Sequence, residues 1–350
     1  MTGYYRKMNG FLFISKYAGM REDLIQAGGG NTSYKESDEK MYIKASGVQL
    51  ADISNISGYS IVNPKIIADA FLKTANIDEI SEEQGKKILE KAVINGMRPS
   101  IETFLHSVSG KYTLHTHPIL VNVLTCRKNG MEILKELFPK ALMVPYATPG
   151  VALAKAYFKT YMESENRDTS GITTSFLQNH GLIVSGDSPE VVMNETESIV
   201  KKIENFLNIN YSGYRRVTEI WRIFPERIVW KVTDFNVLQA YDKLGKTWTP
   251  AFCPDCIVFL GKKILELDSK WEKEIYMFEE QYGNPIIIAL YGELYILADS
   301  VKKALETQSV LSFSAQVMLL NSGEECNLLS EEEQNMLINW EAEKYRKTMK

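Results

Sequence analysis

The chain has 350 residues, 45% of them hydrophobic and 24% charged, which are ordinary values for a globular protein and enough for one large or two ordinary domains. The formal net charge of −4 gives no electrostatic argument for nucleic-acid binding, and no basic stripe suits an anionic membrane. The longest strongly apolar run, residues 286–291, is too short to span a bilayer, and residues 1–16 do not resemble a secretion signal. With four cysteines expected to be reduced thiols, the sequence predicts a cytoplasmic protein without nucleic-acid or membrane partners.

The first two thirds of the chain alternates helix and strand patterns. A capping box, Ser81-Glu82-Glu83-Gln84, opens one helix, and proline stands near the start of two others. The glycine run 28–30 ends the first helix, and a short polar strand or turn follows it. The predicted helices span residues 17–27, 64–73, 82–93, 101–109, 151–165 and 189–207. The predicted strands span residues 40–45, 112–117, 143–146, 173–178 and 182–185.

The pattern changes after Ser212. Residues 220–232 are rich in aromatic side chains and arginine, two strands are expected at 286–291 and 293–298, a long helix at 300–320, and a final charged helix after Ser330. We therefore predict two domains, a catalytic domain at residues 1–215 and a smaller α+β extension of unknown role at residues 216–350. The chain has neither a GxGxxG nor a GxxxxGK[ST] motif, so neither a dinucleotide-binding fold nor a P-loop is indicated.

Three of the four histidines stand where they could bind one metal ion. His115 and His117 are two residues apart, so both side chains leave the same face of a strand. His180 follows Asn179 in a predicted tight turn and would supply a third imidazole. Three imidazoles suit zinc and leave a coordination position open, although another divalent metal would also fit. The alternative is that these are structural histidines with ordinary hydrogen bonds.

Glu102 admits two interpretations. An acid in the first turn of a helix that Ser100 could cap would complement the helix dipole. Alternatively, Glu102 is a general base beside a metal that polarises a carbonyl group. His106 would share a helix face with Glu102, and we expect it to form hydrogen bonds around the site rather than to bind metal.

Small polar residues recur in three further segments. The segments Gly28–Ser33, Lys44–Gly47 and Pro99-Ser100 could be plain turns, or their backbone N–H groups and short side chains could hold a phosphate group. The single CxxC motif, Cys253–Cys256, has no second pair or suitably spaced histidine, so we interpret it as two incidental thiols.

These motifs occur in an order that resembles the class II aldolase/adducin family. The series is Gly30-Asn31-Thr32-Ser33, Ser46-Gly47, Pro99-Ser100-Ile101-Glu102, His115-Thr116-His117-Pro118, Pro145-Tyr146 through Pro149-Gly150, and Asn179-His180-Gly181. The resemblance covers about residues 10–210 and is strongest to the aldolase part of bacterial bifunctional rhamnulose-1-phosphate aldolase/dehydrogenase proteins. No dehydrogenase domain follows in this chain, so we expect that second activity to be absent.

The resemblance implies a three-layer α/β/α fold with a mostly antiparallel central sheet, and a homotetramer with active sites between subunits. It implies that His115, His117 and His180 bind zinc and that Glu102 is the catalytic acid/base. It also implies a sugar-phosphate pocket formed by Gly30, Asn31, Ser46, Gly47 and Ser100. Relatives often have two consecutive serines before the acid, whereas here Ile101 replaces the second, which weakens the phosphate assignment.

The activity implied is zinc-dependent cleavage of a ketose 1-phosphate, or a related sugar, to dihydroxyacetone phosphate and an aldehyde through an enediolate. The same scaffold carries sugar-phosphate epimerases, a dehydratase and decarboxylases, and the epimerases typically have aspartate at the position of Glu102. A non-catalytic adducin-like interaction module is the alternative from another class, but such modules lose the metal ligands, and this sequence keeps three.

Overall fold

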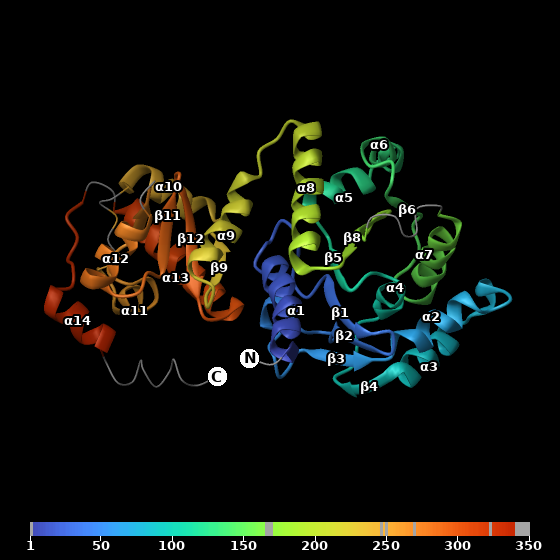
Figure 1. Cartoon of the computed structure of the whole chain (residues 1–350). Helices are drawn as coiled ribbons and strands as arrows, with labels where there is room; N and C mark the ends of the chain where they lie inside the picture. Colours follow the sequence, from blue (N-terminus) through green and yellow to red (C-terminus); the bar gives the residue numbers. More distant parts are fainter. Residues whose placement is uncertain are drawn as a thin grey trace. The chain divides into compact units, whose positions relative to one another are not determined.

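The computed structural model describes residues 3–164, 171–245, 248, 251–268, 271–321 and 324–339 (Figure 1). These residues divide between Tyr211 and Ser212 into two compact units, each with a sheet of its own. Within the described parts of the chain, no helix is both long and apolar enough to cross a membrane.

An eight-stranded sheet forms the centre of the first unit, in the order β4-β3-β2-β1-β5-β8-β7-β6. Neighbouring strands are antiparallel except for the parallel pair β6 and β7. The strands are β1 Asn31–Ser37, β2 Lys40–Lys44, β3 Tyr59–Val62, β4 Val93–Gly96, β5 Tyr112–Thr116, β6 Leu142–Val144, β7 Thr173–Leu177 and β8 Gly181–Gly186. Strand β5 lies between β1 and β8, and every residue in it is buried.

Helices cover both faces of this sheet (Figure 1). One face carries α1 Gly3–Gly19, α5 Ile119–Thr125, α6 Gly130–Leu137 and α8 Pro189–Leu207. The other carries α2 Pro64–Leu72, α3 Glu82–Ala92, α4 Thr103–Ser107 and α7 Val151–Glu163. Two short 3-10 turns are also present, Leu50–Asp52, which contacts α1, and Ile77–Glu79. Helix α8 begins where the sequence predicts, because the Ser188 side chain accepts a hydrogen bond from the Val191 N–H and proline occupies the first turn. The predicted three-layer α/β/α fold with a mostly antiparallel sheet is therefore confirmed.

The second unit is an α+β structure, as predicted. Its four-stranded sheet has the order β10-β11-β12-β9. The elements are α9 Ser212–Ile223, β9 Ile228–Lys231, α10 Phe235–Leu244, α11 Pro254–Leu260, β10 Leu265–Leu267, α12 Trp271–Tyr282, β11 Ile287–Leu290, β12 Glu293–Ala298, α13 Val301–Leu320 and α14 Glu331–Asn339. Tyr291 and Gly292, both with positive φ, form the two-residue turn of the β11–β12 hairpin.

The helix predicted at residues 17–27 is wrong. Helix α1 ends at Gly19, and turns without regular helix follow to residue 29. The segment contains charged residues that a helix at the surface would expose to solvent. In the structure Arg21 and Asp23 are instead buried as an ion pair within a turn segment. The sequence of β1, Asn-Thr-Ser-Tyr-Lys-Glu-Ser, is polar and is therefore compatible with either a strand or a turn. In the structure it is a strand whose first four residues are buried. The helix predicted at 151–165 ends at Glu163, and residue 165 lies outside the described residues.

The close approach of α3 and α7 gives a stability prediction. A Cβ at Gly85 would overlap Val151 Cγ2, so Gly85→Ala overpacks this contact. Overpacking costs about 1–3 kcal/mol and the better helix propensity of alanine returns up to about 1 kcal/mol, so we expect the free energy of unfolding to fall by about 1 kcal/mol. In a Val151→Ala background the same change should be neutral or stabilising, as measured by denaturant titration of the four proteins. An equal loss in both backgrounds would contradict this packing contact.

Candidate metal centre

Strand β5 presents His115 to the interior. The His115 side chain is fully buried, and its Nδ1 lies 3.0 Å from the carbonyl oxygen of Leu182 on β8. A carbonyl can only accept, so Nδ1 carries the proton and donates it. In the neutral imidazole the lone pair then lies on Nε2, where it could bind a metal, and the ring orientation is fixed by the neighbouring strand.

His117 lies just beyond the end of β5. Its backbone N–H donates to the Leu24 carbonyl at 2.9 Å. Its ring lies between two glycines, because an added Cβ would stand 2.9 Å from Nδ1 at Gly29 and 3.0 Å from Cδ2 at Gly181. The prediction that both histidines lie in the strand is thus correct for His115, whereas His117 is held by segments outside the β5 ladder.

His180 comes from the turn between β7 and β8. Asn179 adopts a left-handed conformation with φ of 55°, and the His180 N–H donates to the Leu177 carbonyl at 3.1 Å. Asparagine is one of the few residues that adopt this conformation readily, so the Asn-His-Gly sequence fits the tight turn.

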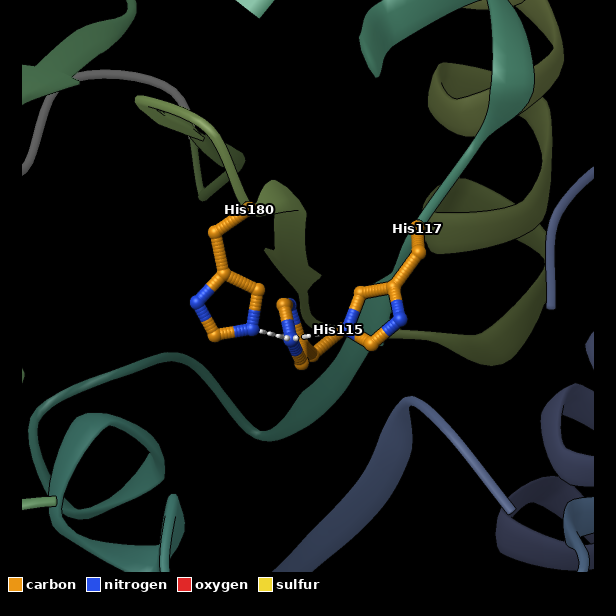
Figure 2. Close-up of side chains that lie close together, drawn as sticks. All are labelled: His115, His117 and His180. Carbon is orange, nitrogen blue, oxygen red and sulfur yellow. Dashed lines mark hydrogen bonds between the residues drawn. The ribbon is translucent and has the colours of Figure 1, made fainter. Parts of the chain in front are cut away.

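The three rings converge through their Nε2 atoms (Figure 2). His115 Nε2 lies 3.2 Å from His180 Nε2 and 3.2 Å from His117 Nε2. Nitrogen ligands of a tetrahedral ion with metal–nitrogen bonds of about 2.0–2.1 Å are separated by about 3.3 Å. The three imidazoles therefore fit a metal ion, and in the described part of the chain they are the group of His, Cys, Asp and Glu side chains that could hold one.

Glu102 faces the imidazoles. It occupies the N-cap of α4 but makes no side-chain hydrogen bond to the helix. Its Oε1 lies 3.0 Å from His180 Nε2, and its Oε2 lies 3.4 Å from His115 Nε2. Burial alone would raise the pKa of Glu102, but His115 and His180 outweigh burial and hold it well below its usual range. The geometry thus favours a role for Glu102 in the site over a purely helix-capping one.

Asn31 and Ser100 extend the site from Glu102. Asn31 begins β1 directly opposite His115, and its Nδ2 donates to Glu102 Oε2 and, at 3.3 Å, to Ser100 Oγ. Its Oδ1 is buried and has no hydrogen-bond partner among the described residues, which marks an acceptor available to a ligand. Gly30, with φ of +63°, approaches the His115 carbonyl so closely that an added Cβ would stand 2.7 Å from the oxygen.

The other predicted pocket residues lie on an adjoining loop. Ala45 pairs with Pro99, and the Ser100 N–H donates to the Lys44 carbonyl at 3.1 Å, so the segment with Ser46 and Gly47 runs beside the one with Ser100. Both Ser46 and Gly47 are exposed. Gly30, Asn31 and Ser100 therefore make direct contacts with His115, with Glu102 or with each other, whereas Ser46 is near the site only through its backbone neighbours.

Lys44 is a site residue that the sequence analysis did not single out. It is buried, and its Nζ donates to the Gly28 carbonyl at 3.2 Å. Burial lowers the pKa of Lys44, and the Glu102 carboxylate partly opposes that shift. Its alternation with Tyr42 and Lys40 on β2 could have revealed that it shares their face, but not that this position is buried beside the glycine segment. His106 is buried with its Nδ1 2.7 Å from Ser33 Oγ, so its hydrogen bond goes to β1 rather than to Glu102.

The part of the chain that contains the three histidines matches a known protein family. Residues 15–207 match the model of the Class II Aldolase and Adducin N-terminal domain. YuxG of Bacillus subtilis (strain 168), described as an uncharacterized oxidoreductase, is 28% identical over 211 residues, which are 56% of this chain and 29% of YuxG. The chain thus spans less than a third of the length of that relative.

Two solved structures are similar to about 60% of the chain. One is the N-terminal class II aldolase domain of a conserved protein from Thermoplasma acidophilum, with a TM-score of 0.49 and 27% identity, covering 59% of this chain and 96% of the other. Another is YgbL from Klebsiella pneumoniae, whose description leaves aldolase, epimerase and decarboxylase open. It has a TM-score of 0.42 and 17% identity, covering 60% of this chain and 93% of YgbL.

The packing around His117 gives a matched pair of variants. In Gly29→Ala the new Cβ would stand 2.9 Å from His117 Nδ1, so the ring must move. We expect the affinity of metal-free protein for Zn2+, measured by competition with a chelating dye, to fall roughly 10-fold or more, as when an outer partner of a metal ligand is lost. Gly28→Ala is the control, because nothing lies within 4 Å of its added Cβ. Equal affinities of the two variants would show that the ring is not held in this way.

Proposed function

The chain belongs to the class II aldolase and adducin family, and from this premise we propose that it is a metal-dependent aldolase. His115, His117 and His180 would hold Zn2+, and Glu102 would be the acid/base. The observation that carries the proposal is the convergence of three Nε2 atoms with the buried Glu102 carboxylate at 3.0 Å from one of them. We propose residues 1–215 as the catalytic domain and residues 216–350 as an extension.

The proposed reaction is the cleavage of a ketose 1-phosphate to dihydroxyacetone phosphate and an aldehyde. A bound divalent metal would supply Lewis acidity at the substrate carbonyl. The bond between carbons 3 and 4 breaks, the hydroxyl on carbon 4 loses its proton to become the aldehyde, and carbon 3 takes up a proton. Glu102, whose carboxylate borders the point where the imidazoles converge, would exchange the proton at carbon 3.

The substrate pocket is proposed to include Gly30, Asn31, Ser46, Gly47 and Ser100. The unpartnered Oδ1 of Asn31 offers an acceptor for a sugar hydroxyl, and the Ser100 hydroxyl offers a donor. The buried ammonium group of Lys44 adds positive charge on the same side, which suits an anionic substrate. Zinc, a homotetrameric assembly and a cytoplasmic location remain predictions of the sequence.

Epimerase, dehydratase and decarboxylase activities are the main alternatives on this scaffold. Each activity would use the same metal ligands. Which reaction takes place would therefore depend on which bond of the bound substrate lies next to the Glu102 carboxylate. A non-catalytic module is disfavoured by the intact set of three imidazoles and by the orphaned Asn31 Oδ1, both of which indicate a ligand site.

Substrate cleavage tests the proposal directly. Zinc-loaded protein should release dihydroxyacetone phosphate from at least one member of a panel of ketose 1-phosphates, as measured by coupled reduction with NADH. Glu102→Gln keeps the size of the side chain but cannot accept the proton, so we expect roughly a 10²–10⁴-fold lower kcat with an unchanged zinc content. Absence of release by zinc-loaded wild type would favour epimerase, dehydratase or decarboxylase chemistry instead.

Ile101 gives a test of substrate phosphorylation. This side chain is 41% exposed beside Gly150, at a position where relatives often carry a serine. If the substrate phosphate lies here, Ile101→Ser adds a hydrogen bond to a charged group, and KM for the ketose 1-phosphate should fall roughly 10-fold. Ile101→Ala controls for removal of the apolar side chain. A higher KM in both variants, with better turnover of unphosphorylated ketoses by wild type, would indicate an unphosphorylated natural substrate.

A further inference from the structure

Strand β5 ends at Thr116, and the backbone that follows it forms hydrogen bonds with the turn segment 20–25 instead of with the sheet. The His117 N–H donates to the Leu24 carbonyl at 2.9 Å, and the Ile119 N–H donates to the Asp23 carbonyl at 2.9 Å. Pro118 between them has no N–H to donate. Both backbone donors that flank Pro118 therefore bond to the turn segment 20–25, and the position of the His117 backbone depends on the shape of that segment.

Arg21 fixes this shape from inside. Its Nε and Nη2 donate to the two carboxylate oxygens of Asp23 at 2.6 and 2.7 Å, which is a fork-to-fork pair. The backbone carbonyl of Arg21 also accepts from the N–H groups of Leu24 and Ile25, each at 2.9 Å. The side chains of Arg21 and Asp23 are only 0% and 2% exposed, so water does not compete for these bonds.

The pair is anchored to the helical layer behind it. Arg21 Nη1 donates at 2.6 Å to Glu197 Oε1 on α8, and the Tyr17 hydroxyl on α1 donates to the same oxygen at 2.7 Å. Burial alone would lower the pKa of Arg21, but the adjacent Asp23 carboxylate outweighs burial and raises it. The guanidinium therefore stays charged.

We propose that the Arg21–Asp23 pair, anchored by Glu197, is a positioning element for the metal ligand His117. The inference rests on the proposed metal centre. His115 is oriented by its strand neighbour and His180 by its tight turn, whereas His117 lies outside the β5 ladder and is held through Leu24. Metal sites need their ligands within about 0.5 Å and 10–20° of the productive geometry, so a ligand at a strand end requires such external support.

A double-mutant cycle on the full chain tests the coupling. Zn2+ affinity is measured for wild type, Arg21→Met, His117→Ala and the double variant. If Arg21 acts through His117, Arg21→Met should weaken binding roughly 10–100-fold in the wild-type background and by less than about 2-fold in the His117→Ala background. The absorption spectrum of Co2+-loaded Arg21→Met should shift toward that of His117→Ala.

Two controls separate positioning from general destabilisation. Leu89→Ala removes buried apolar contact on α3, in the opposite helical layer, and should lower the melting temperature without changing the Co2+ spectrum. Arg21→Lys keeps the charge but loses the fork, and Glu197→Gln removes only the outer anchor, so both should give smaller losses that also depend on His117. If Arg21→Met does not fold, either of these two variants replaces it in the double-mutant cycle with His117→Ala.

The outcomes are distinct. Equal losses of affinity from the Arg21 variants in both backgrounds, or a Co2+ spectrum that stays at the wild-type form, would overturn the positioning role while leaving the metal centre intact. Wild-type protein that binds neither Zn2+ nor Co2+ would overturn the proposed metal centre itself, and this inference with it.

Discussion

The hydrogen bond from His115 Nδ1 to the Leu182 carbonyl is the interaction around which the site is organised. It joins two central strands, β5 and β8, and turns the Nε2 atom of His115 toward His180 and Glu102. The ladder continues on the other side, where Asn31 of β1 pairs with His115. The central position of β5 therefore decides which side chains from distant segments can meet.

The three imidazoles are held in three different ways. His115 belongs to a ladder, His180 to a turn that needs a left-handed Asn179, and His117 to a turn segment shaped by buried charges. A buried ion pair is costly to desolvate and contributes little net stability, so it is better explained as specifying one conformation than as strengthening the fold. Here the conformation specified is that of the segment whose carbonyls accept from the backbone around His117.

Local patterns predict several of the helices and strands and single out the three histidines that lie together in the structure, whereas the three-layer fold is what the resemblance to the class II aldolase/adducin family implies. Period-two spacing, a capping box at Ser81 and proline at the start of α8 are each readable within a few residues. Local patterns do not show that the charged residues Arg21, Asp23 and Lys44 are buried, and the helix predicted over residues 17–27 ends at Gly19. Arg21 pairs not only with the nearby Asp23 but also with Glu197, which lies 176 residues away, and a pattern of neighbouring residues cannot reveal such a distant partner.

The charges around the site constrain what it can bind. Glu102 contributes one buried negative charge and Lys44 one buried positive charge, while imidazoles that bind a metal are neutral. A divalent ion would therefore leave the pocket with a net positive charge in surroundings of low dielectric constant, which an anionic substrate or a developing oxyanion would neutralise. Such a charge would favour cleavage, since breaking a bond next to a carbonyl places negative charge on the oxygen. The same charge would suit a phosphorylated sugar, although the exposed side chain of Ile101 has no hydroxyl with which to bind a phosphate group.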